Sequence, residues 1–153
     1  VEDLKEGHGP QFARHSIDMR IKAPKGPLRV KLVKGMVVQI LENLLSNSVY
    51  WMKMRADREA AYKPAIDVRI ETDPLTIRFS DNGRGIAPDH RERVFRAYWS
   101  LKEKSKRRGL GLFIAASNAE DIKGKLTLSD KADKQTGRLH EFVLELPDTA
   151  VVR

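Results

Sequence analysis

Residues 79–88 read FSDNGRGIAP, a strand end that runs into a loop with two glycines. The preceding residues 75–80 alternate apolar and polar side chains, which predicts a strand that ends at Asp81. An Asn-Gly pair commonly forms a hairpin turn, but no second alternating strand follows it. Gly83 and Gly85 therefore indicate a backbone that passes close to a ligand, and Asp81 could accept a hydrogen bond from an amino group.

A long helix is expected before this strand and its glycine loop. Between Gly35 and about Arg55 the apolar residues recur at helical spacing, with no internal proline. Asn43 and Asn47 are four residues apart, an advance of roughly 400°, so both amides project from nearly one face. An amide among apolar neighbours must find partners. The two asparagines therefore either bond locally or to solvent at the edge of the apolar stripe, or they serve a ligand.

Two segments follow the glycine loop. A short helix is expected after Pro88 with Asp89 as a possible cap, followed by a basic run, KEKSKRR, at 102–108. This run is either a solvated loop or an anion site. The sequence GLGL at 109–112 opens a second helix that closes near Gly124. Glycines at a helix start either form a tight turn or expose N–H groups to phosphate.

Alternating apolar residues predict the remaining strands. These cover residues 16–23, 28–33 and 66–71, the last before a turn at 72–74, and the two arms of a hairpin at 125–130 and 138–147. Strands that pair as antiparallel neighbours, with helices packed on one face, make an α+β two-layer sandwich. We expect one domain over 16–147, a leading segment over 1–15 from a missing upstream region, and a C-terminal tail over 148–153.

Composition limits the possible functions. The 153 residues carry a net charge of +8, with 41% hydrophobic and 33% charged residues, which is typical of one folded domain. The absence of cysteine excludes disulfides, thiolate metal sites and cysteine nucleophiles. No stretch approaches the roughly 18 apolar residues of a membrane span, and the basic run lacks the interleaved aromatic residues of a nucleic-acid module. We therefore expect no nucleic-acid partner and no membrane contact by this fragment.

The order and spacing of these segments resemble the GHKL ATP-binding superfamily, and the histidine kinase catalytic domain is the best fit. QILENLLSNSVYW is similar to its N box, FSDNGRGIAP to its G1 box, RVFRAYWSLK to its F box and RGLGLFIA to its G2 box, while FVLELP resembles its closing strand. The resemblance covers roughly Ser16 to Pro147. It implies the Bergerat ATP-binding fold, a mixed and mostly antiparallel sheet with helices on one face and a flexible ATP lid.

The resemblance implies a role for each matching residue. Asn47 would coordinate a Mg²⁺ ion that bridges the ATP phosphates, with Asn43 on the same wall as a second catalytic position. Asp81 would accept from the adenine amino group, and Phe95 would anchor one edge of the lid. The other nucleotide-binding positions lie in the loop, the lid and the start of the second helix: Gly83, Gly85, Ile86, Lys102, Arg107, Arg108, Gly109, Leu110, Gly111 and Leu112.

The implied activity is that of a two-component sensor histidine kinase, which donates the γ-phosphate of Mg-ATP to a histidine. None of the four histidines has the helical setting and adjacent acidic residue of a phosphoacceptor, so the acceptor is expected on another segment or chain. The implied partners are a phosphoacceptor-histidine dimerisation domain and a response regulator, and the implied location is the cytoplasm.

Two alternatives stay open. GHKL ATPases place a glutamate base four residues before the magnesium asparagine, where this chain has Asn43, and Glu42 points about 140° away from Asn47 around the helix. This difference favours a kinase over an ATPase module. A nucleotide-binding switch without phosphotransfer is the other alternative, because Tyr50 replaces a phosphate-contacting lysine and Arg107 a glycine.

A further departure lies before the closing strand. The family's Gly-Thr pair falls on Leu139 and His140, so the contacts expected from that threonine must come from elsewhere or be missing.

Overall fold

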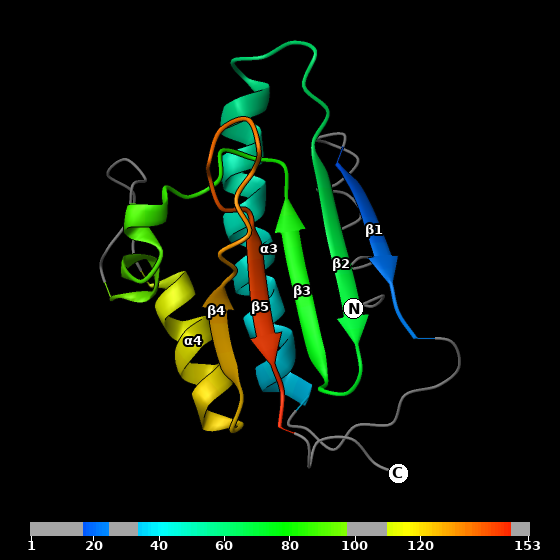
Figure 1. Cartoon of the computed structure of the whole chain (residues 1–153), viewed down its shortest axis with the longest axis vertical. Helices are drawn as coiled ribbons and strands as arrows, with labels where there is room; N and C mark the ends of the chain where they lie inside the picture. Colours follow the sequence, from blue (N-terminus) through cyan, green and yellow to red (C-terminus); the bar gives the residue numbers. More distant parts are fainter. Residues whose placement is uncertain (1–16, 25–33, 98–109, 148–153) are drawn as a thin grey trace.

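Five strands form one mixed sheet in the described part of the chain (Figure 1). The structure is a computed structural model that describes residues 17–24, 34–97 and 110–147. β1 and β2 pair in parallel and the other neighbours are antiparallel, which confirms the expected α+β class. The strands are β1 (Asp18–Lys22), β2 (Ala65–Glu71), β3 (Thr76–Asp81), β4 (Lys125–Leu128) and β5 (Glu141–Glu145), in the order β1-β2-β3-β5-β4.

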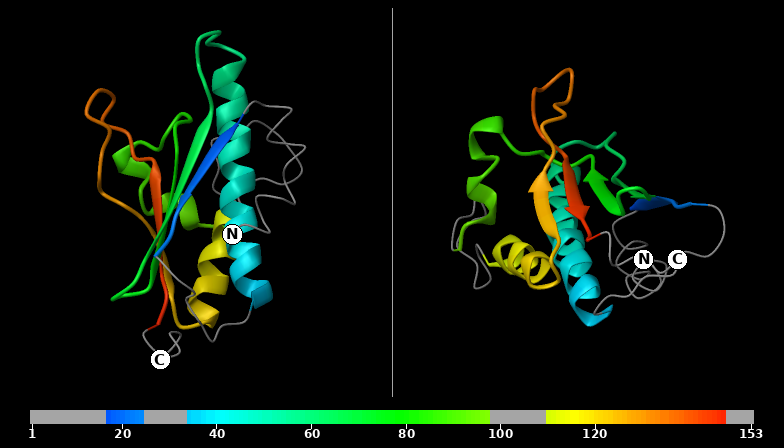
Figure 2. Two further views of the ribbon diagram at one scale, coloured as in Figure 1. Left: turned by 90° about the vertical axis from the view of Figure 1, so that its right-hand side faces the viewer. Right: turned by 60° about the horizontal axis from the view of Figure 1, so that its bottom comes forward.

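Two α-helices, α3 (Lys34–Ala56) and α4 (Gly111–Asp121), cover one face of this sheet (Figure 2). The helical spacing of apolar residues in α3 places its buried side chains on the stripe that meets the sheet and α4. None of the described helices has the length and apolar character needed to cross a lipid bilayer. The buried residues of α3 are Ile40, Leu41, Leu44, Leu45, Ser48, Val49 and Met52.

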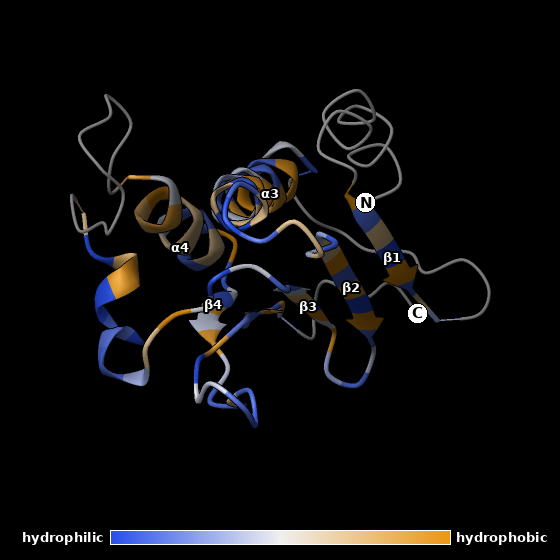
Figure 3. Ribbon diagram, turned by 90° about the horizontal axis from the view of Figure 1, so that it is seen from above, coloured by the Kyte–Doolittle hydropathy of each residue, from blue (hydrophilic) through white to orange (hydrophobic). Residues whose placement is uncertain are grey.

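The hydrophobic core lies between the helices and the inner face of the sheet. Val68, Phe79 and Leu144, from three neighbouring strands, are each at most 2% exposed. Successive residues of a strand point to opposite faces, so the alternating apolar residues of β1 and β2 give each of these strands one apolar side. Figure 3 shows the alternation as hydrophilic and hydrophobic bands along both strands. The two-layer arrangement follows from this pattern.

The outer face of the sheet is polar. Arg78 on β3 bonds Glu71 on β2 at 2.8 Å and Glu141 on β5 at 3.0 Å. These ion pairs link three strands through side chains that would be costly to bury.

The segment after Pro88 differs from the prediction of a short helix. It forms two 3₁₀ turns, η1 (Pro88–His90) and η2 (Arg93–Phe95). Asp89 is not the cap, because Ala87 occupies that position and makes no side-chain hydrogen bond. The two turns bury little besides Val94. This is too little apolar surface to offset the cost of nucleating an α-helix.

The end of α4 also differs in detail from the sequence pattern. Lys123, and not Gly124, adopts the left-handed conformation, with φ 65°. Gly124 is required for another reason, because a Cβ there would lie 2.5 Å from the backbone oxygen of Glu145. The glycine therefore permits a close approach between the helix end and β5.

The last hairpin has shorter strands than predicted, 125–128 and 141–145. Its connection turns at Asp133, whose Oδ1 accepts hydrogen bonds from the N–H groups of Gln135 and Thr136. Gly137 follows with φ +71°. The predicted strand at 28–33, the basic run and both terminal segments lie outside the described residues.

Candidate functional site

Asp81 ends β3, as the sequence pattern predicts, and its carboxylate contacts α3. Its Oδ2 accepts a hydrogen bond of 2.5 Å from Ser48 Oγ, and its Oδ1 accepts one of 2.8 Å from the N–H of Gly83. Ser48 is fully buried on α3 and was missed by sequence reasoning. Its signal was a serine at the apolar spacing of the helix, directly after Asn47. The carboxylate therefore has a fixed orientation, with lone pairs left on both oxygens.

Asn82 joins the loop to the segment that precedes β2. Its Oδ1 accepts from the Tyr62 hydroxyl at 2.9 Å and from the N–H of Ala65 at 2.8 Å, while its Nδ2 donates to the carbonyl of Lys63. Burial, and next the charge of Asp81, raise the pKa of Tyr62 to about 12, so its hydroxyl remains a donor above pH 10. The Asn-Gly pair thus anchors a loop rather than turning a hairpin.

Gly83 and Gly85 bring the loop backbone close to side chains of this chain. A Cβ at Gly83 would lie 3.0 Å from Asp81 Oδ1. Gly85 has φ +74°, and a Cβ there would lie 2.6 Å from His140 Nε2. The N–H of Ile86 then donates to the carbonyl of Leu139 at 2.8 Å, which ties the loop to the segment before β5.

Asn43 lies on the part of α3 that faces the start of α4. Asn43 Nδ2 is buried and has no hydrogen-bond partner among the described residues. A Cβ on Gly111 would lie 4.0 Å from Asn43 Oδ1, so the start of α4 faces this amide. Asn47 is half-buried one turn further along the helix. The tertiary structure thus brings Asn43 beside Gly111 at the start of α4.

The start of α4 leaves its backbone donors without a side-chain cap. Leu110 is the N-cap residue and makes no such bond, and Gly111 is the first helical residue. Leu112 packs against the core. N–H groups at an uncapped helix start favour anions. Gly109 lies outside the described residues.

Phe95 closes η2 with its ring against the core. It makes an edge-to-face contact with Phe142 of β5, with ring centroids 6.0 Å apart. The predicted lid residues Lys102, Arg107 and Arg108 lie outside the described residues. The role of Phe95 as the anchor of a lid therefore stays a prediction.

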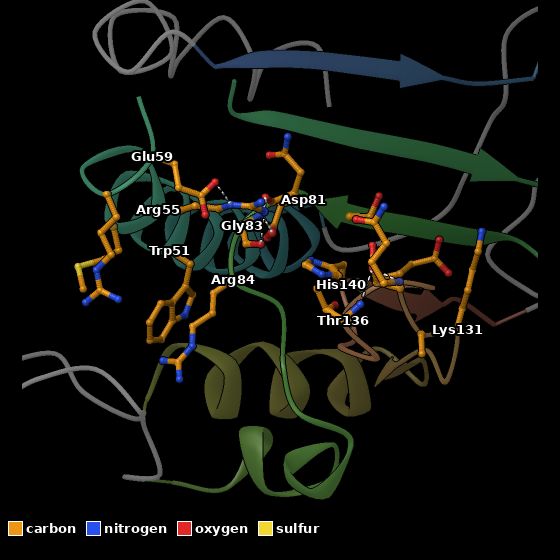
Figure 4. Close-up of a pocket in the computed structure, with 17 residues that line it drawn as sticks. Trp51, Arg55, Glu59, Asp81, Gly83, Arg84, Lys131, Thr136 and His140 are labelled. Carbon is orange, nitrogen blue, oxygen red and sulfur yellow. Dashed lines mark hydrogen bonds and ion pairs between the residues drawn. The ribbon is translucent and has the colours of Figure 1, made fainter. Parts of the chain in front are cut away.

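A pocket of about 600 Å³ opens beside Asp81 (Figure 4). The last turns of α3, the end of β3 and residues 131–133 and 135–136 line it. Trp51, with Arg84 stacked 5.3 Å over its ring, lies on one side of Asp81, and His140 lies on the other. His140 Nδ1 is buried without a hydrogen-bond partner among the described residues. Neither Asn43 nor Asn47 lines this pocket.

The sequence of residues 33–150 matches the family described as histidine kinase-, DNA gyrase B-, and HSP90-like ATPase. The sensor protein kinase CarS of Pseudomonas aeruginosa is 32% identical over 129 residues, which are 84% of this chain and 26% of CarS. The methanogenesis regulatory histidine kinase FilI of Methanothrix harundinacea is 28% identical over 148 residues, 95% of this chain and 16% of FilI. The chain therefore spans about a quarter or less of these two relatives.

Solved structures share the fold. The catalytic domain of histidine kinase ThkA has a TM-score of 0.74 at 19% identity, over 96% of this chain and 90% of that domain. Full-length ShkA in complex with AMPPNP has a TM-score of 0.73 at 23% identity, over 99% of this chain and 29% of ShkA. By its sequence match and its fold, the chain belongs to the family of histidine kinase-, DNA gyrase B- and HSP90-like ATPases.

Proposed function

We propose that this domain binds Mg-ATP and donates its γ-phosphate to a histidine on another segment or chain, as the catalytic domain of a two-component sensor histidine kinase. The observation that carries the proposal is the Asp81 carboxylate, oriented by Ser48 and the Gly83 N–H at the wall of a pocket. The sensor kinases among the relatives support the choice of a kinase within the ATPase family.

Asp81 is the residue that would select the base. A carboxylate offers acceptors only, which suits the exocyclic amino group of adenine. Gly83, Gly85 and Ile86 would shape the same end of the site, since the loop that they form is held against His140 and Leu139. The site would therefore prefer adenine nucleotides over nucleotides whose base presents a carbonyl group to Asp81.

Asn43, Asn47 and the start of α4 would hold the phosphates. The buried Nδ2 of Asn43 has no partner among the described residues, which fits a donor that serves a ligand oxygen. Gly111 faces that amide from the uncapped helix. Leu110 is the N-cap of this helix, and Leu112 packs its first turn against the core. Phe95 would anchor a lid that would carry Lys102, Arg107, Arg108 and Gly109.

The residues present also fit a magnesium ion. The described ranges contain no group of three or more His, Asp or Glu side chains able to hold a metal, so the ion would take most of its ligands from phosphate and water. Asn47 would supply the protein ligand. When bound, magnesium would neutralise phosphate charge, and the protein's part is to position the nucleotide.

Hydrolysis is disfavoured by the groups near the proposed phosphate position. Asn43 occupies the position of a hydrolase base, and a neutral amide cannot take a proton from water near pH 7. Glu42 is exposed on α3 and is separated from Asn47 by about 140° around the helix. A phosphoacceptor-histidine dimerisation domain and a response regulator are then the partners that complete the reaction.

Calorimetry with ADP and ATP, with and without Mg²⁺, tests nucleotide binding. We expect a magnesium-dependent heat signal that Asn47→Ala weakens, while Ser46→Ala, an exposed neighbour on the same helix, binds as the parent does. The absence of heat at millimolar nucleotide would contradict the proposal. Transfer of labelled γ-phosphate to a histidine, measured in the full-length protein that contains this domain, tests the kinase activity.

A further inference from the structure

The loop at 82–85 is held through its backbone carbonyl groups by two arginines that come from distant parts of the chain. On one side, Arg55 Nη1 donates to the carbonyl of Asn82 at 2.8 Å and to that of Gly83 at 3.2 Å. Arg55 lies in the last turn of α3, 27 residues from Asn82 in the sequence. The end of the helix is therefore bonded directly to the first half of the loop.

On the other side, Arg138 contacts the second half of the loop. Its Nε donates to the carbonyl of Arg84 at 2.9 Å, and its Nη2 donates to that of Gly85 at 3.0 Å. Arg138 follows the turn at Gly137, so this contact comes from the connection between β4 and β5. Four consecutive carbonyl groups thus accept from two cations that approach from separate elements.

Arg55 is itself oriented by its neighbours. Its Nε bonds Glu59 Oε2 at 3.2 Å, and its guanidinium lies 4.7 Å from the centroid of the Tyr62 ring. The Tyr62 hydroxyl also bonds the Asn82 side chain. Arg55 and Tyr62 therefore act on the same end of the loop, and a planar guanidinium fixed in this way loses little freedom when it bonds two carbonyl groups.

The surroundings of Arg138 disfavour its positive charge. Burial, and next the charge of Arg84, lower the pKa of Arg138, although an arginine remains charged at neutral pH. A partly buried cation beside another cation needs compensating acceptors. The two loop carbonyl groups supply them.

The position of the loop decides the orientation of Asp81, because the N–H of Gly83 donates to Asp81 Oδ1. A loop with two glycines has many accessible conformations, and a ligand would have to select one of them. We propose that Arg55 and Arg138 are positioning residues that hold the loop at 82–85 from both sides and so preorganise Asp81 for the adenine base. This inference rests on the proposed nucleotide-binding function.

The test compares Arg55→Ala and Arg138→Ala with Arg91→Ala. Arg91 is a matched control because its Nε also donates to a backbone carbonyl at 2.8 Å, that of Leu128, away from the loop. Calorimetry should show Mg-ADP binding weakened about tenfold by each of the first two variants, since charge-assisted hydrogen bonds are lost, and unchanged in the control. Arg55→Lys and Arg138→Lys keep one charged donor and should recover part of the affinity.

Hydrogen exchange of the amides at 82–86 in the nucleotide-free protein is the second measurement. Both alanine variants should exchange faster in this loop while the amides of β3 and β5 stay protected, whereas a general loss of stability would accelerate exchange everywhere. Parent-like exchange in the loop, or equal effects of all three alanine variants on affinity, would overturn the proposal. A parent that binds no nucleotide would refute the proposed function, and loop exchange would still decide whether the arginines hold the loop.

Discussion

Replacing Asp81 with asparagine separates the role of its charge from its role in the fold. The amide oxygen can still accept from the Gly83 N–H, and the new NH₂ group can donate to Ser48 Oγ, because a hydroxyl both donates and accepts. Both hydrogen bonds therefore have replacements. We expect Asp81→Asn to lower the free energy of unfolding by only about 1 kcal/mol.

The effect on nucleotide binding should be much larger. The variant loses an acceptor, a loss of about 1.5–3 kcal/mol for a hydrogen bond to a charged group. Where the amide presents NH₂ to the adenine amino group, two donors meet and each is left unpaired, at a further cost of about 1 kcal/mol or more. A total of about 2.5–4 kcal/mol corresponds to roughly a 70-fold to 1,000-fold increase in Kd.

Titration calorimetry with Mg-ADP, together with denaturant unfolding of the same samples, measures both effects. Asp67→Asn is the matched control, because Asp67 is exposed on β2 and its substitution should change neither quantity. An Asp81→Asn protein that binds Mg-ADP within about threefold of the parent would refute the assignment of the base-recognition role. A large loss of stability in that variant would refute the claim that its two protein hydrogen bonds can be replaced.

The remaining predictions concern the phosphate end, the loop and the pH response. Asn43→Glu should raise the slow steady-state release of phosphate from ATP, because a carboxylate can take a proton from water; an unchanged rate would place position 43 away from the attacking water. In denaturant titrations, Gly85→Ala should cost about 2–3 kcal/mol, because φ is +74° and the Cβ would meet His140, whereas Gly137→Ala, at φ +71° with open space, should cost about 1 kcal/mol. Because the pKa of Tyr62 is raised, its contribution to the free energy of unfolding is fully present below pH 10 and is lost as the pH rises from 10 to about 12. Solvent screening reduces this loss to about 1 kcal/mol, and Tyr62→Phe should flatten the pH dependence of unfolding by that amount.

The element pattern of this protein was predictable because it depends on local periodicity. The apolar spacing of α3 predicted a helix within one residue at each end, since a long amphipathic repeat is recorded entirely in neighbouring residues. The sequence could not show that the segment after Pro88 forms 3₁₀ turns and not a short α-helix. That outcome depends on how much apolar surface the segment buries, which its own few residues do not reveal. The resemblance implied a mixed sheet, but it did not show that β1 and β2 are the parallel pair, because a register such as Met19 opposite Ile66 joins strands far apart in the sequence.

The candidate site was likewise predictable only in part. The sequence by itself determined the chemical groups, since Asp81 at a strand end and Asn43 with Asn47 on one helical face follow from residue type and spacing. Only the tertiary structure decided what holds them: Ser48 on the Asp81 carboxylate, and two arginines on the loop carbonyl groups. Arg55 and Arg138 resemble any surface arginine in the sequence, because a guanidinium's partner is set by the packing of α3 and the β4–β5 connection around the loop, and not by its neighbours in the chain.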